Sequence, residues 1–319
     1  MPRFIENTAV LGKIEGTYGL DSVPTGGANA VDVSAVTINA LNAQNVDRAL
    51  LRPWFGASEQ LVGTAYKTLD FSTEIAGSGA KGVAPAFGPL LRAAGLAQVV
   101  TATSLVEYMP VSAAFDSATL YAYDDGIVHK LLGSRGTFDA DLGLGKIPKF
   151  AWKFMGLDGG DFAAQPGTVD YSAVQVAQVV TDANSGDIML GGSYAAGVLS
   201  GGTLYGSTGL TFALGARTVY TPLLGSQSVD VTGREVTGTV QLDLTAAQEV
   251  DFLAKVRANT RQSLGFSHGT LAGRKVVVFM PAVQLINPRK TELNNRRMQT
   301  FDFRAVPVNG NDEIVIAFL

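Results

Sequence analysis

Apolar and polar residues alternate along several stretches of the chain, most regularly in residues 67–75. In this segment, KTLDFSTEI, the apolar residues Leu69 and Phe71 alternate with polar residues that include Asp70 and Glu74. A period of two places the two sets on opposite faces of a strand. The stretch therefore predicts a strand with one face in a core and one acidic face outside.

The same alternation continues on both sides of a turn in residues 137–154. The segment TFDADLGLGKIPKFAWKF alternates up to a glycine turn at 143–146 and then returns with Phe, Trp and Phe at every second position. This pattern predicts a β-hairpin. Its polar face would carry Asp139 and Asp141 on one arm and lysines on the other, and such cross-strand pairs contribute roughly 0.2 to 1 kcal/mol each.

Two stretches carry helix signals. Residues 85–96, PAFGPLLRAAGL, predict a short helix, and residues 245–260 begin with Thr245 and Gln248 in capping-box spacing. The apolar residues expected to share one face of the second helix are Val250, Leu253 and Val256.

These signals recur in the same order along the chain. Residues 36–75 and 210–244 each contain a strand, an irregular stretch with an arginine and a strictly alternating strand, and a helix follows each of them. Residues 129–154 and 274–303 then match as hairpins with an aromatic return strand. The recurrence predicts a tandem duplication, with one β-plus-helix domain at 36–157 and a second at 210–319.

Two segments lie outside these predicted domains. Residues 158–209 belong to a region without lysine or arginine that contains glycine clusters such as GGSYAAGVLSGG, which favours a linker or insertion. Residues 1–35 precede the first copy in the equivalent position and are interpreted as an N-terminal arm.

Composition supports a mainly β protein. Of the 319 residues 16% are charged and 37 are glycine, which suits many turns and few helices. The net charge of −4 excludes the basic field with which proteins grip nucleic-acid phosphates. The absence of cysteine excludes disulfides and thiolate chemistry. The charged N-terminal stretch shows no pattern of a signal peptide.

No motif in the sequence favours catalysis. Glycines at 77, 79 and 82 match G-x-G-x-x-G, but the preceding strand is half polar and no acidic residue follows at the spacing that a dinucleotide fold requires. His129 and His268 have no nucleophile or acid motif around them, and Asp139 and Asp141 are better explained as a solvated sheet surface. We therefore expect no enzyme activity, no cofactor and no metal.

Five segments carry a resemblance to a known family and together cover most of the chain. They are KIEGTYGLDSVPTGGANAV (13–31), VDRALLRPWFGAS (46–58), AGSGAKGVAPAFGPLLRAAGL (76–96), residues 106–157 and SHGTLAGRKVVVFMPAVQL (267–285). The chain resembles the major tail tube protein of long-tailed, non-contractile (siphovirus-type) bacteriophages.

The resemblance implies a fold and an assembly. It implies two tandem β-sandwich or barrel-like tail tube domains, each with a short flanking helix, whose sheets join around a ring into a continuous inner barrel. Stacked rings would form the conduit for DNA ejection. A duplicated chain implies a ring of three copies with pseudo-sixfold symmetry, although a hexamer remains open.

The resemblance also implies partners and a location. The subunit would contact itself, the tail terminator and distal tail proteins, with the tape measure protein and phage DNA transiently in the lumen, and no membrane. It would be assembled in the host cytoplasm and would reside in the virion tail.

Candidate site residues follow from this implied architecture. Acidic side chains on the lumen face would repel phosphates and let DNA slide. The candidates for this face are Asp70, Glu74, Asp139, Asp141 and Asp243. The candidates for contacts between rings are Trp54, Phe55 and Tyr66, together with the N-terminal arm. The alternative for the aromatic residues is that they pack only within their own domain.

Two other protein classes fit parts of the sequence. An outer-membrane-type β-barrel would also be glycine-rich, acidic and free of cysteine, and the chain ends in the apolar segment EIVIAFL. The missing signal pattern and the internal helices argue against it. A glycan-binding β-sandwich is the remaining alternative.

Overall fold

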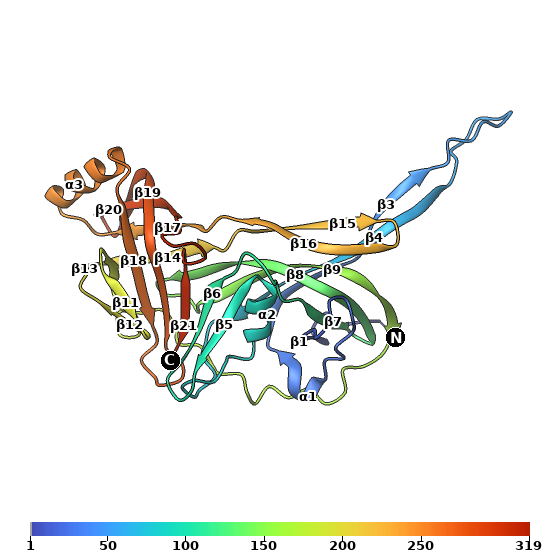
Figure 1. The fold of residues 1–319 in the computed structure, drawn as a ribbon, viewed down its shortest axis with the longest axis horizontal. Helices are drawn as coiled ribbons and strands as arrows, with labels where there is room; N and C mark the ends of the chain where they lie inside the picture. The colour runs from blue at the N-terminus through green and yellow to red at the C-terminus, as the bar shows by residue number, and fades with distance from the viewer. Residues whose placement is uncertain (1) are drawn as a thin grey trace.

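The computed structural model describes residues 2–319, which are mainly β, with 54% strand and 7% helix. One long antiparallel sheet runs through the molecule in the order β3–β4–β9–β8–β14–β17–β20–β19 (Figure 1). Its strands are β3 (Ser34–Asp47), β4 (Gln60–Glu74), β9 (Lys149–Ala163), β8 (Ile127–Gly143), β14 (Ser207–Ala213), β17 (Thr237–Leu242), β20 (Arg296–Ala305) and β19 (Val276–Leu293). The predicted mainly β class is confirmed.

The predicted hairpin forms the centre of this sheet. Phe138 of β8 lies opposite Trp152 of β9, and Asp141 lies opposite Lys149. The apolar set of each strand is buried, whereas the alternating polar set faces the other side. The period of two in the sequence therefore gave both the strands and their faces correctly.

Further strands cover the core face of the long sheet. In the first part of the chain these are β1 (Thr8–Ile14), β2 (Ala30–Val31), β5 (Leu96–Thr101), β6 (Leu105–Pro110) and β7 (Ala118–Asp124), with the short helices α1 (Gly26–Asn29) and α2 (Gly88–Ala93). In the second part they are β10 (Ile188–Leu190), β13 (Thr203–Tyr205), β18 (Arg261–His268) and β21 (Val315–Phe318).

Two hairpins and one helix complete the fold. The hairpin β11–β12 (Ser193–Ala195 and Val198–Ser200) is short, and the hairpin β15–β16 (Ala216–Leu223 and Ser226–Arg234) runs back over β8 and β9 (Figure 1). The tip of the β3–β4 hairpin extends beyond the body of the molecule as an arm (Figure 1). Residues 158–209 include the end of β9, strands β10 to β13 and the start of β14.

The helix α3 (Ala246–Arg257) begins where the sequence predicted, and the Thr245–Gln248 capping box is formed. Of the three apolar residues expected on one face, Val256 packs against the core, whereas Val250 is 69% exposed; Phe252 is fully buried. The Phe252 ring packs edge-on against Tyr205 of β13 and tilted against Phe301 of β20. The largest apolar side chain thus sets the orientation of the helix.

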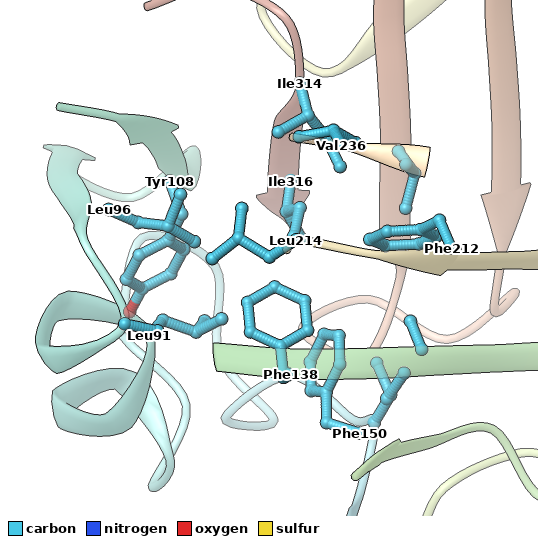
Figure 2. Close-up of a cluster of buried hydrophobic side chains, with 14 of the residues drawn as sticks. Leu91, Leu96, Tyr108, Phe138, Phe150, Phe212, Leu214, Val236, Ile314 and Ile316 are labelled. Carbon is cyan, nitrogen blue, oxygen red and sulfur yellow. The ribbon is translucent and has the colours of Figure 1, made fainter. Parts of the chain in front are cut away.

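One hydrophobic core runs through both parts of the chain. Figure 2 shows Phe138 and Phe150 of the central hairpin beside Phe212, Leu214 and Ile316 of β21. Leu214 has no exposed surface. The C-terminal strand β21 pairs with β6 on one side and β19 on the other, which adds a hydrogen-bonded connection.

The sheet edges and the open face as candidate assembly surfaces

The long sheet consists of two groups of four strands with the same internal order. The first group is β3–β4–β9–β8, and the second is β14–β17–β20–β19. In each group the last two strands are the arms of one hairpin. The groups are joined where Asp139–Gly143 of β8 pairs with Gly209–Ala213 of β14.

A matching irregularity marks the last strand of each group. The pairing of β7 with β8 shifts by one residue between Leu131 and Ser134 of β8. The pairing of β18 with β19 shifts in the same sense between Met280 and Val283. Beyond this bulge β8 leaves β7 and pairs with β14, whereas residues 285–293 of β19 pair with β20 alone within the described chain. One edge of β19 is therefore open.

The first strand of the sheet has the other open edge, because β3 pairs only with β4 in residues 2–319. The Ile75 N–H donates to the Pro148 carbonyl, so odd-numbered residues of β4 direct their backbone groups toward β9. Ile38 lies opposite Leu69, so its N–H and C=O point outward, away from β4. On β20 the Ala305 N–H donates to the Val236 carbonyl, so odd-numbered residues of β20 direct their backbone groups toward β17. Lys290 of β19 lies opposite Gln299 of β20, so the N–H and C=O of Lys290 point outward, away from β20.

Candidate acids lie together on the open face of the sheet, opposite the aromatic core. Asp139 pairs with Lys153 at 2.9 Å, and Asp141 pairs with Lys146 at 2.7 Å. Asp70 lies directly opposite Lys153 on the neighbouring strand. Burial raises the pKa of the Asp70 carboxyl, and the hydrogen bond to Asp139 raises the pKa of Lys153. Lysines thus offset much of this negative charge.

The other two candidate acids lie at the ends of strands on the same face. Glu74 ends β4 opposite Lys149, and Asp243 follows β17 and forms an ion pair with Arg296. The five acids predicted from the sequence are therefore brought to one surface, on which cations accompany them.

Uncharged hydrogen-bonding groups form part of the open face over the second group of strands, beside the ion pairs of Asp302 with Arg289 and of Arg304 with Glu235. The hydroxyls of Thr211 and Thr239 are 2.6 Å apart, and those of Thr291 and Thr300 are 3.0 Å apart. The Gln241 amide donates to the Thr291 hydroxyl at 2.5 Å. Because each hydroxyl can donate and accept, this ladder is satisfied within the chain and carries no net charge.

A comparison with protein families decides the assignment. The family model of the phage tail tube protein matches residues 6–305. The chain belongs to the phage tail tube protein family. No curated protein matches it. The family supports a structural role in the tail tube and a location in the virion tail, and it is consistent with a protein that is not an enzyme.

Two absences concern the part of this tail tube protein that the structure describes. Residues 2–319 contain no helix long and apolar enough to cross a bilayer. Across that same range, no group of three or more His, Asp or Glu side chains is placed to hold a metal ion.

The three candidate aromatic residues separate in the structure. Trp54 and Phe55 lie at the tip of the β3–β4 arm and are 66% and 108% exposed. Tyr66 lies nearer the body, where its ring packs against that of Tyr220 of β15, with centroids 5.0 Å apart. Tyr66 thus contributes to a contact inside the chain, whereas the two tip residues remain available.

The β15–β16 hairpin packs against the first part of the tail tube chain through specific contacts. The Arg135 guanidinium of β8 donates to the Val229 carbonyl at 2.8 Å and lies over the Tyr18 ring. The Tyr18 hydroxyl accepts a hydrogen bond from the Val229 N–H, and Val229 is fully buried. The second part of the chain therefore holds the first through specific contacts beyond the sheet.

The buried Lys67 is a residue that the sequence did not single out. The Lys67 ammonium is fully buried, 2.8 Å from Asp158 and 2.6 Å from Asp161, and Asp161 also contacts His129 at 2.6 Å. Burial alone would raise the pKa of Asp161, but hydrogen bonds from Lys67 and His129 outweigh it and lower that pKa. The alternation offered a signal, because Lys67 occupies the same face as Leu69. The cluster fixes β4 to β9 and β8.

The remaining motifs are structural contacts. The Gly79 N–H donates to the Gly273 carbonyl at 2.9 Å, which joins two loops that are distant in sequence. His268 is buried, with its ring nitrogens 2.9 Å from the Ser185 hydroxyl and 2.9 Å from the Gln178 carbonyl. Both ring nitrogens of His268 are thus occupied by groups of the chain itself, one by a serine hydroxyl and one by a backbone carbonyl.

Proposed function

We propose that three copies of the chain close into a ring, in which β19 of one copy pairs with β3 of the next. The observation that carries the proposal is the joint between β8 and β14, where the last strand of one four-strand group already pairs with the first strand of the other. The same two strand types are left open at the ends of the sheet. A head-to-tail contact of this kind forms a closed ring when its rotation closes.

The register of this contact follows from the joint inside the chain. Leu210, Thr211 and Phe212 of β14 lie opposite Leu142, Asp141 and Ala140 of β8. The strand pairings align β14 with β3 and β19 with β8, once the extra residue of β19 near Asn287 is allowed for. This alignment gives the residues of β3 and β19 that would face each other between two copies. The expected pairs are Val36 with Glu292, Thr37 with Thr291, and Ile38 with Lys290.

Ring closure would also resolve the hazard of the open edges. Unpaired strand edges promote uncontrolled association, and a closed barrel removes them. Three copies carry six four-strand groups, so the ring would have pseudo-sixfold symmetry. This explains how a duplicated chain could replace six single-domain subunits.

We further propose that the open face lines the lumen through which DNA passes during ejection from a siphovirus-type tail. The lysine-paired acids and the threonine ladder support this, since such a face offers phosphates neither a cationic grip nor an uncompensated barrier. The tape measure protein would occupy the same lumen before ejection. Terminator and distal tail proteins would contact the two ends of a tube assembled in the host cytoplasm.

Stacking of the rings is assigned to the arm tip. Trp54 and Phe55 combine large apolar area with high exposure, which suits a contact made only on assembly. Tyr66 would support the base of the arm from within its own chain through Tyr220.

Electron microscopy of the purified protein tests the ring. End-on class averages should show three copies of a two-lobed subunit around a central channel, with side views showing stacks. A protein that stays monomeric across a wide concentration range, or rings of six complete chains, would contradict the proposed closure.

A further inference from the structure

A groove lies beside the open edge of β3. It has a volume of about 440 Å³ and lies between residues 33–38, the N-terminal arm and the end of β7. Ile5 in its wall is 89% exposed. Glu6 and Asp124 lie on its rim, where Asp124 forms an ion pair with Arg3 and Glu6 forms no ion pair within residues 2–319.

The corresponding place beside β14 is filled within the chain. There the turn between β8 and β9 docks against the segment that precedes β14. The Leu144 N–H donates to the Thr208 carbonyl at 2.8 Å, and the Gly145 N–H donates to the Val180 carbonyl at 2.8 Å. The Val180 N–H returns a bond of 2.9 Å to the Lys146 carbonyl. A hairpin turn thus completes the joint beyond the paired strands.

The two joints can be aligned because β3 and β14 hold the same place in their groups. Ser34 of β3 then corresponds to Thr208, and the N-terminal arm corresponds to the segment that contains Val180. The counterpart of the β8–β9 turn is the turn between β19 and β20. This turn is tight, since Asn294 and Asn295 adopt positive φ values of 48° and 64°.

The β19–β20 turn has a composition that suits the groove. Leu293, at its start, is 38% exposed. Arg296 is engaged by Asp243, whereas Arg297 is exposed and has no ion-pair partner in the described chain. A basic, partly apolar turn therefore matches a groove that has the glutamate Glu6 on its rim and an exposed isoleucine in its wall.

We infer that the groove is the receptor for the β19–β20 turn of the next copy in the ring. The inference rests on the proposed ring and extends it by naming the interface beyond the strand edges. The Asn294 N–H donates to the Ser34 carbonyl, Leu293 packs against Ile5, and Arg297 pairs with Glu6. The N-terminal arm thereby clasps the neighbouring subunit.

Charge reversal tests this contact in the full-length protein. Arg297→Glu should raise the concentration needed for ring assembly about tenfold, because it sets two acids against each other at the interface. Glu6→Arg should do the same, and the double variant Glu6→Arg/Arg297→Glu should restore assembly. Arg257→Glu, an exposed reversal on α3, is the matched control and should assemble like the wild type.

The outcomes separate this inference from the ring itself. Sedimentation velocity measures the assembled fraction, and far-UV circular dichroism checks that each variant is folded. If the wild type forms rings and Arg297→Glu forms them equally well, or if the double variant assembles no better than the single ones, the turn does not occupy the groove and the ring proposal stands. If the wild type forms no rings, both fail.

Discussion

Replacement of Leu214 by alanine tests whether both parts of the chain unfold as one unit. Leu214 is fully buried, and Figure 2 shows it between Phe138 of the first part and Ile316 of the C-terminal strand. The substitution removes three carbon atoms, worth about 2.4 kcal/mol at roughly 0.8 kcal/mol each. The cavity adds to this, so we expect a loss of about 3 to 4 kcal/mol in the free energy of unfolding.

Urea denaturation measures this loss with two probes. Far-UV circular dichroism reports on all strands, and fluorescence in a Trp54→Phe background reports on Trp152, which is buried in the first part. Because one core spans both parts, the two curves should coincide and shift together. Leu204→Ala, at a leucine 62% exposed, should shift them by less than about 1 kcal/mol. Separate transitions, of which Leu214→Ala moves only one, would refute the shared core.

The remaining predictions concern the buried cluster, the sheet edge and the open face. Because the pKa of Asp161 is lowered in the folded state, it contributes stability above the unfolded pKa of about 3.9 that is lost as pH falls through the folded value. Asp161→Asn should therefore be less stable than the wild type at pH 7 and show a flatter loss on acidification in urea titrations; an unchanged slope would contradict this role. Ile38→Pro removes an N–H that points outward from the sheet, so it should abolish rings while the circular dichroism spectrum stays native. Thr37→Pro removes a donor to β4, so it should also lower stability. Rings formed by Ile38→Pro would count against edge pairing. Asp139→Lys/Asp141→Lys should leave tubes intact but slow genome ejection, measured by DNA release from virions, and unchanged kinetics would remove these acids from the lumen.

Local patterns predicted the elements that depend on nearby residues. The β8–β9 hairpin and the α3 capping box are determined within 20 residues of sequence, and both formed as expected. Val250 was assigned wrongly to the packing face of α3 because periodicity ranks positions by spacing, whereas Phe252 is selected by aromatic partners on β13 and β20. The residues that contact Phe252 come from distant parts of the sequence, so tertiary structure sets them.

The three candidate aromatic residues do not lie together in the structure, for a geometric reason. Phe55 and Tyr66 are close in sequence, but the chain between them is largely extended, so about 3.3 Å per residue separates them by roughly 35 Å. The joint between β8 and β14 was equally hidden, because sequence patterns identify strands and faces but not which edges meet. The sequence showed Lys67 as a polar residue on an apolar face, but it did not show which acidic residues would pair with it.

Disulfide trapping tests the central claim, that β19 of one copy pairs with β3 of the next, most directly. The chain contains no cysteine, so any cross-link comes from the introduced pair. Thr37→Cys/Thr291→Cys places thiols at a non-hydrogen-bonded pair, where Cα atoms about 4.5 Å apart allow a disulfide. Asp141→Cys/Thr211→Cys is the intrachain equivalent and should close within a monomer. Asn39→Cys/Thr291→Cys is offset by two residues and should react poorly.

The readout is a non-reducing denaturing gel of oxidised rings. The account predicts covalent dimers and a final trimer from Thr37→Cys/Thr291→Cys, with little product from the offset pair. Rings that are visible by microscopy but yield only monomers, while Asp141→Cys/Thr211→Cys closes fully, would contradict the pairing of β19 with β3.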